Sequence, residues 1–563
     1  MQVLKEILKM LNHLPLTFWK SYVFNSQDLK NISAVCRDTY QIVQALRRSR
    51  DFSFASRILK IPSEWISLDM LPQLKVTLDR FVQRYNLTEY RSVKHIVYFS
   101  SGEAEDFYQI CQVIPTEFYI SVYFNAIRSE NYNGLLMNTF RGLGNRFISF
   151  NLQDNNLNNS SAESMIECLE HTPFLEELNL SNNCFLLENL EKLTRRLYML
   201  HNLTDLNISG NIINIRNAQT LAPALKYMTG LLRLDMCGIH MGNISLNILS
   251  KSIMCMTKLE YLNLGSNWTG SESQGDLALI LQSLPNLKDL DLSYSEIGTT
   301  KMNVLAPVIC NLSKLKRLNL RGNEIGEYFE THIPLFKIPT LAFLDISLNR
   351  FTSKGVARLA ESLETMTSLT HLSLKNNEVG TEGCVLLSSP IKKLKRMTTL
   401  DIGHFVDSDL TPLIVSLSSL PNLTSLDMSC NQRMSDLHVL GGLSNLVCLN
   451  ISDNNIGEEG SAELSVSLSK MSRLTSLNLN ANGIFDIGLI SLLESISSLV
   501  NLETIMLGYN YLESESTVAL GNHLQSLTSL QILDLSNNEI TESDIEYLKS
   551  KLCSEKYCLE IIE

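Results

Sequence analysis

One pattern of leucine residues recurs along most of this chain and restricts what the chain can fold into. From Phe147 to the end of the sequence, the motif L-x-x-L-x-L-x-x-N-x-L returns about every 28 residues. Its copies begin at residues 147, 175, 203, 231, 259, 287, 315, 341, 369, 397, 423, 446, 474, 502 and 530, and a truncated copy begins at Cys558. A fixed period of this length predicts a solenoid, which offers a long surface to another macromolecule.

Each copy predicts a strand, a turn and a helix. In residues 178–180 two leucines flank a polar residue, and this alternation predicts a short, half-buried strand. The asparagine at the ninth position, such as Asn183, follows the strand, where its side-chain amide can bond backbone groups that have no ladder partner. The rest of a copy, as in residues 356–366, has most of its apolar residues three or four apart, which predicts an amphipathic helix.

Stacking these units predicts a curved array. Strands of neighbouring units stack about 4.8 Å apart, whereas helices need about 8–10 Å, so we expect parallel strands on the concave side and helices on the convex side. This α/β arrangement resembles the ribonuclease-inhibitor-like class of leucine-rich repeats. The resemblance covers residues 147–563 and implies a horseshoe-shaped solenoid whose concave face binds a protein partner.

The sequence before the array predicts two further segments. Residues 61–146 contain apolar triplets at the phase of the repeat, within 65–70, 93–98 and 119–124, but they lack the asparagine. We therefore expect irregular early repeats or a capping region there. Residues 1–60 have helical apolar spacing and predict a small helical N-terminal segment.

Part of this helical segment, residues 11–54, resembles an F-box. The matching positions are Leu14, Pro15, Leu29, Val35 and Cys36. The resemblance implies that these residues bind the small adaptor protein of a cullin-type ubiquitin ligase (SCF), with the repeats serving as the substrate receptor. In the alternative interpretation, residues 1–60 are only a helical cap over the first apolar face of the solenoid.

Irregular columns of the predicted concave face are the candidate recognition surface. Exposed aromatic and arginine side chains dominate the binding energy of many protein interfaces. The candidate partner-binding residues are Tyr261, Trp268, Tyr294, Arg317, Arg321, Phe343, Leu348, His371 and Lys375. Later copies carry short hydroxyl residues such as Thr398 and Thr424 near the equivalent places, and a second, smaller aromatic cluster appears at Tyr509 and Tyr511. The Asn/Asp column beside these positions is interpreted mainly as a structural feature of the repeat.

Charge and cysteine usage restrict the partner and the compartment. Residues 1–60 carry ten Lys or Arg and four Asp or Glu, whereas the remaining 503 residues carry 37 and 55. An acidic array argues against nucleic acid and favours basic protein segments. No apolar run reaches the ~18 residues that cross a bilayer, so no membrane partner is expected. The twelve cysteines are scattered without a C-x-x-C pair, which indicates a reducing compartment, the cytoplasm or the nucleus.

Catalytic and metal-binding motifs do not appear in the sequence. We find no G-x-x-x-x-G-K-[S/T], H-E-x-x-H or G-x-S-x-G motif and no Cys/His cluster at zinc spacing. The sequence therefore predicts a non-enzymatic recognition protein without a cofactor or metal. Its leading specific interpretation is a ubiquitin-ligase substrate receptor, and its alternatives are an intracellular scaffold or sensor and a Ran-type GTPase-activating protein.

Overall fold

The computed structural model describes most of the repeat array and parts of the sequence before it. The described residues are 57–61, 75, 95–101, 111–112, 114, 118–124, 132–157, 160–183, 185, 187–268, 274–326, 337–431, 433–552 and 559–562. The chain packs as two compact units. Unit 1 comprises residues 1–212 and 223–233, and unit 2 comprises residues 213–222 and 234–563. The expected boundaries after residues 60 and 146 stay predictions.

Unit 1 is built from parallel strands that pair in chain order. The strands are β1 (Arg57–Ile61), β2 (His95–Ser101), β3 (Phe118–Phe124), β4 (Phe147–Asn151), β5 (Glu177–Asn179) and β6 (Asp205–Asn207). The helices between the later strands are α6 (Tyr132–Leu143), α7 (Ser160–Cys168) and α8 (Leu187–Leu197). Helix α9 (Ile215–Tyr227) and strand β7 (Arg233–Asp235) contain residues of both units.

The irregular early repeats or capping region expected over residues 61–146 stays a prediction, and the structure describes strands β2 and β3 within that range. Strand β3 contains the apolar triplet within 119–124, and β2 contains the last two residues, Ile96 and Tyr98, of the triplet within 93–98. Both strands join the parallel sheet. Strand β1 was not expected, because most of it falls at the end of the segment predicted to be helical. The triplet within 65–70 and the F-box-like positions Leu14, Pro15, Leu29, Val35 and Cys36 lie outside the described residues.

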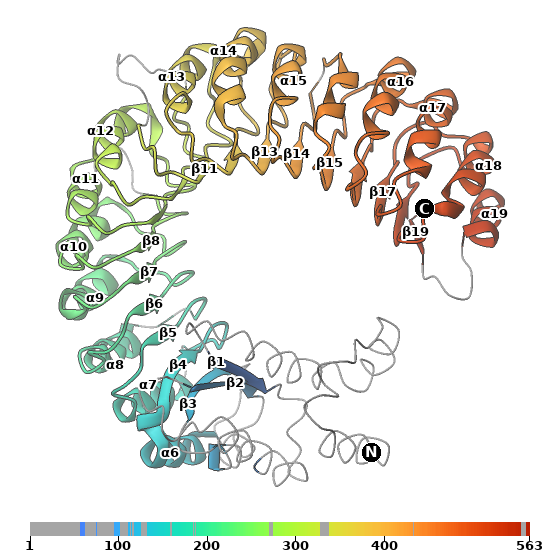
Figure 1. Cartoon of the computed structure of the whole chain (residues 1–563). Helices are drawn as coiled ribbons and strands as arrows, with labels where there is room; N and C mark the ends of the chain where they lie inside the picture. The colour runs from blue at the N-terminus through green and yellow to red at the C-terminus, as the bar shows by residue number, and fades with distance from the viewer. Residues whose placement is uncertain are drawn as a thin grey trace, which may run out of the picture. The chain divides into compact units, whose positions relative to one another are not determined.

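Unit 2 repeats one strand and one helix along its length. Its strands are β8 (Tyr261–Asn263), β9 (Asp289–Asp291), β10 (Arg317–Asn319), β11 (Phe343–Asp345), β12 (His371–Ser373), β13 (Thr399–Asp401), β14 (Ser425–Asp427), β15 (Cys448–Asn450), β16 (Ser476–Asn478), β17 (Thr504–Met506), β18 (Ile532–Asp534) and β19 (Glu560–Ile562). Each pairs in parallel with the next. Within this unit the strands line the concave side, as predicted (Figure 1).

The helices of unit 2 cover its convex side (Figure 1). They are α10 (Asn243–Ile253), α11 (Gln274–Gln282), α12 (Gly298–Cys310), α13 (Ser353–Leu363), α14 (Gly380–Lys393), α15 (Thr411–Leu417), α16 (Gly457–Leu468), α17 (Phe485–Ser497), α18 (Ser514–His523) and α19 (Glu542–Leu552). In most three-residue strands the middle residue is a leucine that lies against the core, as Leu344 and Leu372 show with at most 1% exposure. The predicted α/β solenoid is confirmed.

A ladder of buried asparagines closes the turn after most strands of the repeats. Asn349 is fully buried, and its Nδ2 donates to the carbonyl oxygens of Leu320 (2.8 Å) and Ser347 (3.0 Å). Its Oδ1 accepts hydrogen bonds from the backbone N–H groups of Asn323 (3.0 Å) and Ile325 (3.3 Å) in the preceding repeat. The asparagine therefore bonds backbone groups that no strand ladder reaches, which confirms the predicted role.

The copies that begin at 397 and 423 depart from the regular unit. Phe405 occupies the asparagine position of the first copy and is buried. Helix α15 has only seven residues, and a six-residue 3₁₀-helix, η5 (Leu437–Gly442), takes the place of the next helix. These units have 26 and 23 residues, and a shorter unit leaves fewer residues for the convex helix at about 1.5 Å per residue.

Candidate interaction surface

Three rows of side chains form the strand-lined face of unit 2. The first row holds the first residue of each strand, the second row holds the third residue, and the third row holds the second residue after each strand. In most strands the first and third residues are half-buried while the middle residue is fully buried. Alternation along a strand sends these two residues away from the core, so they are available to a partner.

The second row is mostly asparagine and aspartate, and its main role is structural. One side-chain oxygen accepts a hydrogen bond from the backbone N–H two residues later, at 2.8–3.2 Å in the repeats of unit 2 that follow this pattern. Asp345, for example, accepts from the N–H of Ser347 at 2.9 Å. This bond holds the chain as it leaves the sheet. The structural interpretation of the column is confirmed.

The first row brings Arg317, Phe343 and His371 together on adjacent strands. Arg317 Nε lies 3.2 Å from the Oδ2 of Asp289, and its guanidinium carbon lies 3.9 Å from the centre of the Phe343 ring. The Phe343 and His371 ring centroids are 5.9 Å apart. His371 Nδ1 also lies 2.8 Å from Thr370 Oγ1. The Arg317 guanidinium, the Phe343 ring and the His371 imidazole thus form one continuous cluster.

A second cluster joins Tyr294 to Arg321. Arg321 Nε donates to the Tyr294 hydroxyl at 2.7 Å, and Arg321 Nη1 donates to Ser347 Oγ at 2.9 Å. Tyr294 has a left-handed backbone, with φ of 51°, and its side chain is 45% exposed. Gly322 makes room for the ring, because a Cβ at this glycine would lie 2.5 Å from Tyr294 Cδ1.

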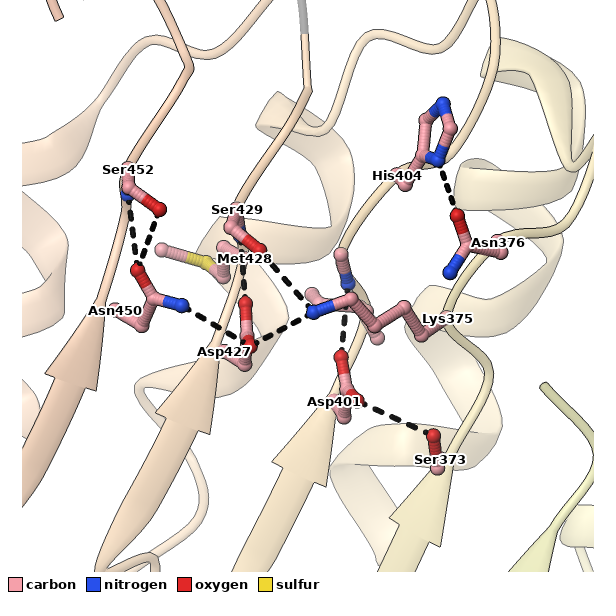
Figure 2. Close-up of polar contacts among 12 residues, drawn as sticks. Ser373, Lys375, Asn376, Asp401, His404, Asp427, Met428, Ser429, Asn450 and Ser452 are labelled. Atoms are coloured by element: carbon pink, nitrogen blue, oxygen red, sulfur yellow. Dashed lines mark hydrogen bonds and ion pairs between the residues drawn. The ribbon is translucent and has the colours of Figure 1, made fainter. Parts of the chain in front are cut away.

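Lys375 forms the centre of a third cluster (Figure 2). Its Nζ lies 3.1 Å from Asp427 Oδ2 and 3.4 Å from Ser429 Oγ, although Asp427 belongs to β14 and Lys375 follows β12. In the third row, Gly403 lies between Lys375 and Ser429. A Cβ at Gly403 would lie 3.0 Å from Ser429 Oγ and 3.2 Å from Asp427 Oδ1, so a larger residue would crowd the groups that bind the lysine.

Two neighbouring carboxylates in this cluster differ in their proton affinity. Burial and the charge of Asp427 raise the pKa of Asp401, which accepts a hydrogen bond from Ser373 Oγ (Figure 2). For Asp427, burial opposes ionisation, but the hydrogen bonds from Ser429 and Lys375 outweigh it and lower the pKa. Burial also disfavours the charged form of Lys375, yet the bond to Asp427 and both carboxylate charges raise its pKa. The cluster therefore carries a fixed lysine–aspartate pair beside a second carboxylate.

The remaining predicted residues lie apart from these clusters. The Tyr261 hydroxyl donates to Asp235 Oδ2 at 3.1 Å. Trp268 is 61% exposed, and its ring packs edge-on against His240 at 5.6 Å. Leu348 is half-buried and has a left-handed backbone with φ of 55°. The structure thus gathers six of the nine predicted residues into clusters and leaves Tyr261, Trp268 and Leu348 beside them.

Sequence reasoning missed the acidic partners of these clusters. Asp289, Asp401 and Asp427 each contact a predicted residue or neighbour one. Asp401 and Asp427, however, belong to the Asn/Asp column that was interpreted mainly as a structural feature of the repeat. Gly403 is the sequence feature that could have predicted the Lys375 cluster, because a glycine in the third row leaves space for a long side chain from the preceding repeat.

The arrangement of strands, helices and buried asparagines has a match among known families. The family described as "Leucine-rich repeat region" matches residues 330–556, and the family described as "Leucine Rich repeat" matches residues 311–327. The repeating units are leucine-rich repeats. A solenoid of leucine-rich repeats is suited to protein–protein recognition.

Comparison with known proteins found similarity over parts of this chain. A stretch of 120 residues, 21% of this chain, is 35% identical to Toll-like receptor 4 of Equus caballus and spans 13% of that receptor. A crystal structure of the internalin inlF from Listeria monocytogenes is 21% identical, with a TM-score of 0.35, over 70% of this chain and 82% of the internalin. A leucine-rich-repeat protein of Leptospira interrogans is 17% identical, with a TM-score of 0.41, over 81% of this chain and 92% of that protein.

The part of the chain that the structure describes holds neither a metal site nor a membrane-spanning helix. There, no group of three or more His, Cys, Asp or Glu side chains could hold a metal ion. None of the helices described has the length and apolar character that crossing a bilayer requires. The absence of a cofactor, of catalysis and of a nucleic-acid partner stays a prediction.

Proposed function

We propose that the strand-lined face of unit 2 binds a protein partner and that its centre is the region from β9 to β14. The observation that carries this proposal is the presence of three prearranged clusters on consecutive repeats of one sheet. Arg317 stacks on Phe343, Arg321 bonds Tyr294, and Lys375 pairs with Asp427. Together they present aromatic, cationic and anionic groups on a single face.

The contacts within the clusters favour tight binding. A side chain already held in place loses less conformational freedom when a partner docks, which lowers the cost of association. Arginine and aromatic residues are also the most frequent hot spots in protein interfaces. The first row of the later repeats instead holds Thr399, Ser425 and Ser476, whose short side chains offer little contact area.

The charge of this face favours a partner that presents basic groups. Second-row aspartates at 291, 345, 401 and 427 lie beside the clusters. Arg317 and Lys375 are already paired with aspartates, at 3.2 Å and 3.1 Å. A partner with basic side chains complements the remaining carboxylates and would associate faster at low salt.

Affinity capture with matched variants tests this proposal. The unchanged chain, Trp268→Ala and Phe343→Ala are used as bait. Thr398→Ala and Thr424→Ala, at the residues immediately before β13 and β14, are the controls. We expect each aromatic variant to lose about 2 kcal/mol of affinity for the captured partner. Equal losses of affinity in the two threonine controls would show that the surface around Trp268 and Phe343 is not the recognition site.

A finer proposal concerns the N-terminal segment, and it is supported by the F-box-like positions in the sequence. In it, Leu14, Pro15, Leu29, Val35 and Cys36 bind the adaptor of a cullin-type ubiquitin ligase, and the repeats bind the substrate in the cytoplasm or nucleus. Polar replacement of Leu14 and Pro15 together with Val35 and Cys36 should abolish co-purification of the adaptor while the repeats stay folded. Unchanged adaptor binding would favour a scaffold or sensor whose N-terminus is only a cap.

The remaining proposals concern repeat class and activity. The spacing of about 28 residues supports placing these repeats in the ribonuclease-inhibitor-like class. A Ran-type GTPase-activating protein uses the same kind of repeat, and a GTP hydrolysis assay with the purified chain separates this alternative from a receptor or scaffold.

A further inference from the structure

A second group of exposed aromatic residues lies in the copies that begin at 474 and 502. Phe485, Tyr509 and Tyr511 are 46%, 57% and 58% exposed. The rings of Phe485 and Tyr511 are stacked, with centroids 5.3 Å apart and an interplanar angle of 16°. Tyr509 lies two residues before Tyr511 in the same loop between β17 and α18. These three residues, the aromatic platform, are separate in sequence from the central clusters.

All three platform residues have a left-handed backbone. Their φ angles are 54°, 57° and 56° in chain order. A bulky side chain in this conformation costs about 1–2 kcal/mol, whereas glycine and asparagine adopt it readily. In the copy that begins at 446, the positions of Tyr511 and Phe485 are occupied by Asn455 and Gly457.

The backbone cost of the platform is not offset by packing into the core. Apolar side chains stabilise a fold in proportion to the area that they bury, and these rings stay about half exposed. A bound partner that covers the rings would supply the missing burial. This argues that the aromatic residues serve recognition rather than stability.

The charge around the platform indicates the chemistry of the partner. Residues 474–548 contain ten Asp or Glu and no Lys or Arg. Asp486, beside Phe485, accepts hydrogen bonds from the Glu513 N–H and from Ser516 Oγ, so part of this charge caps helix α18. Glu513 and Glu515, which follow Tyr511, have exposed side chains.

We propose that Phe485, Tyr509 and Tyr511 bind an arginine- or lysine-rich segment of a partner protein. A guanidinium group stacks on the exposed face of an aromatic ring, and the surrounding carboxylates attract its charge. The same carboxylates repel phosphate groups, which disfavours nucleic acid at this surface. This surface is additional to the central clusters and does not depend on them.

Fluorescence anisotropy with labelled peptides tests the proposal on the full-length chain. The probe is an eight-residue peptide of alternating arginine and glycine, and the comparison peptides replace arginine with lysine or with glutamate. We expect the arginine and lysine peptides to bind, more weakly as salt increases, and the glutamate peptide not to bind. Binding of the glutamate peptide with similar affinity would overturn the proposal.

Two variants separate ring stacking from general charge attraction. Tyr511→Asn and Phe485→Gly place at these positions the residue types of the 446 copy, so the fold should be retained and the melting temperature should not fall. Each should weaken binding of the arginine peptide about tenfold, because the stacking surface is lost. Unchanged affinity in both variants would show a charge effect only and would overturn the proposal.

Tyr227→Ala is the matched aromatic control. Tyr227 is 68% exposed, its ring lies 5.5 Å from that of Tyr198, and Lys226 precedes it. Its replacement should leave peptide binding unchanged, and an equal loss would contradict the assignment to the platform. The two readouts are separate, because partner capture with Phe343→Ala tests the central clusters and peptide binding with Tyr511→Asn and Phe485→Gly tests the platform.

Discussion

Lys375 reaches past an entire repeat to pair with Asp427, with Nζ 3.1 Å from Oδ2. The two residues are 52 positions apart in the sequence. Lys375 follows β12 and Asp427 belongs to β14, and β13 lies between these strands. Gly403 in the intervening repeat keeps the path of the lysine side chain open. The pair therefore links three consecutive repeats across the concave face of unit 2.

Removing the lysine should destabilise this part of the solenoid. Lys375→Met leaves Asp401 and Asp427 without their cation, and both side chains are only half-exposed. We expect the free energy of unfolding in urea to fall by about 1 kcal/mol. The control is Lys192→Met, which breaks an exposed pair with Glu163 and should cost at most about 0.5 kcal/mol. Equal effects would mean that the Lys375 pair is an ordinary surface contact.

Asp401→Asn should stabilise the chain at neutral pH. The pKa of Asp401 is raised in the folded state, so the folded chain binds this proton more tightly than the unfolded chain does. Ionised Asp401 therefore costs stability above its folded-state pKa, and the cost disappears as the pH falls below 3.8. We expect a gain of about 0.5 kcal/mol at pH 7 in urea unfolding, discounted for solvent screening, and no gain below pH 3.8. A loss at pH 7 would contradict the prediction.

His371 should titrate below its ordinary range. Burial, and then the charge of Arg317, lower its pKa from 6.5. The contribution of neutral His371 to stability is therefore complete above pH 6.5 and is lost as the pH falls through the folded-state pKa. In an NMR titration, Arg317→Met should move the pKa of His371 upward, whereas Arg317→Lys should leave it low. An unchanged pKa in Arg317→Met would show that the arginine charge has no part in the shift.

Much of the fold follows from the sequence because the repeat fixes local structure. The period predicts where each strand lies, and the ninth-position asparagines predict the turn, as Asn349 shows. The pairing of exposed side chains could not be predicted in the same way. Whether Lys375 meets Asp427 depends on a glycine one repeat away and on the stacking distance between strands. Strand β1 was missed because its residues have no repeat motif around them.

The asparagine ladder should be essential to stability. Asn349→Ala removes two donors and two accepted bonds at a fully buried site, which leaves backbone groups unpaired. We expect a loss of about 2–4 kcal/mol in the free energy of unfolding. Asn247→Ala is the control, because Asn247 is exposed on α10 and its side-chain amide donates to the carboxylate of Asp276. A loss below about 0.5 kcal/mol for Asn349→Ala would contradict this role.

Quantitative affinity capture with Phe343→Ala as bait, compared with the unchanged chain and with Thr424→Ala, tests recognition by the concave face most directly. We expect the unchanged chain and Thr424→Ala to retain the same partner proteins with similar affinity. Phe343→Ala should bind these partners about thirtyfold more weakly, the equivalent of about 2 kcal/mol. Undiminished capture by Phe343→Ala, with melting temperatures equal across the three chains, would contradict the assignment of the central clusters as the binding site.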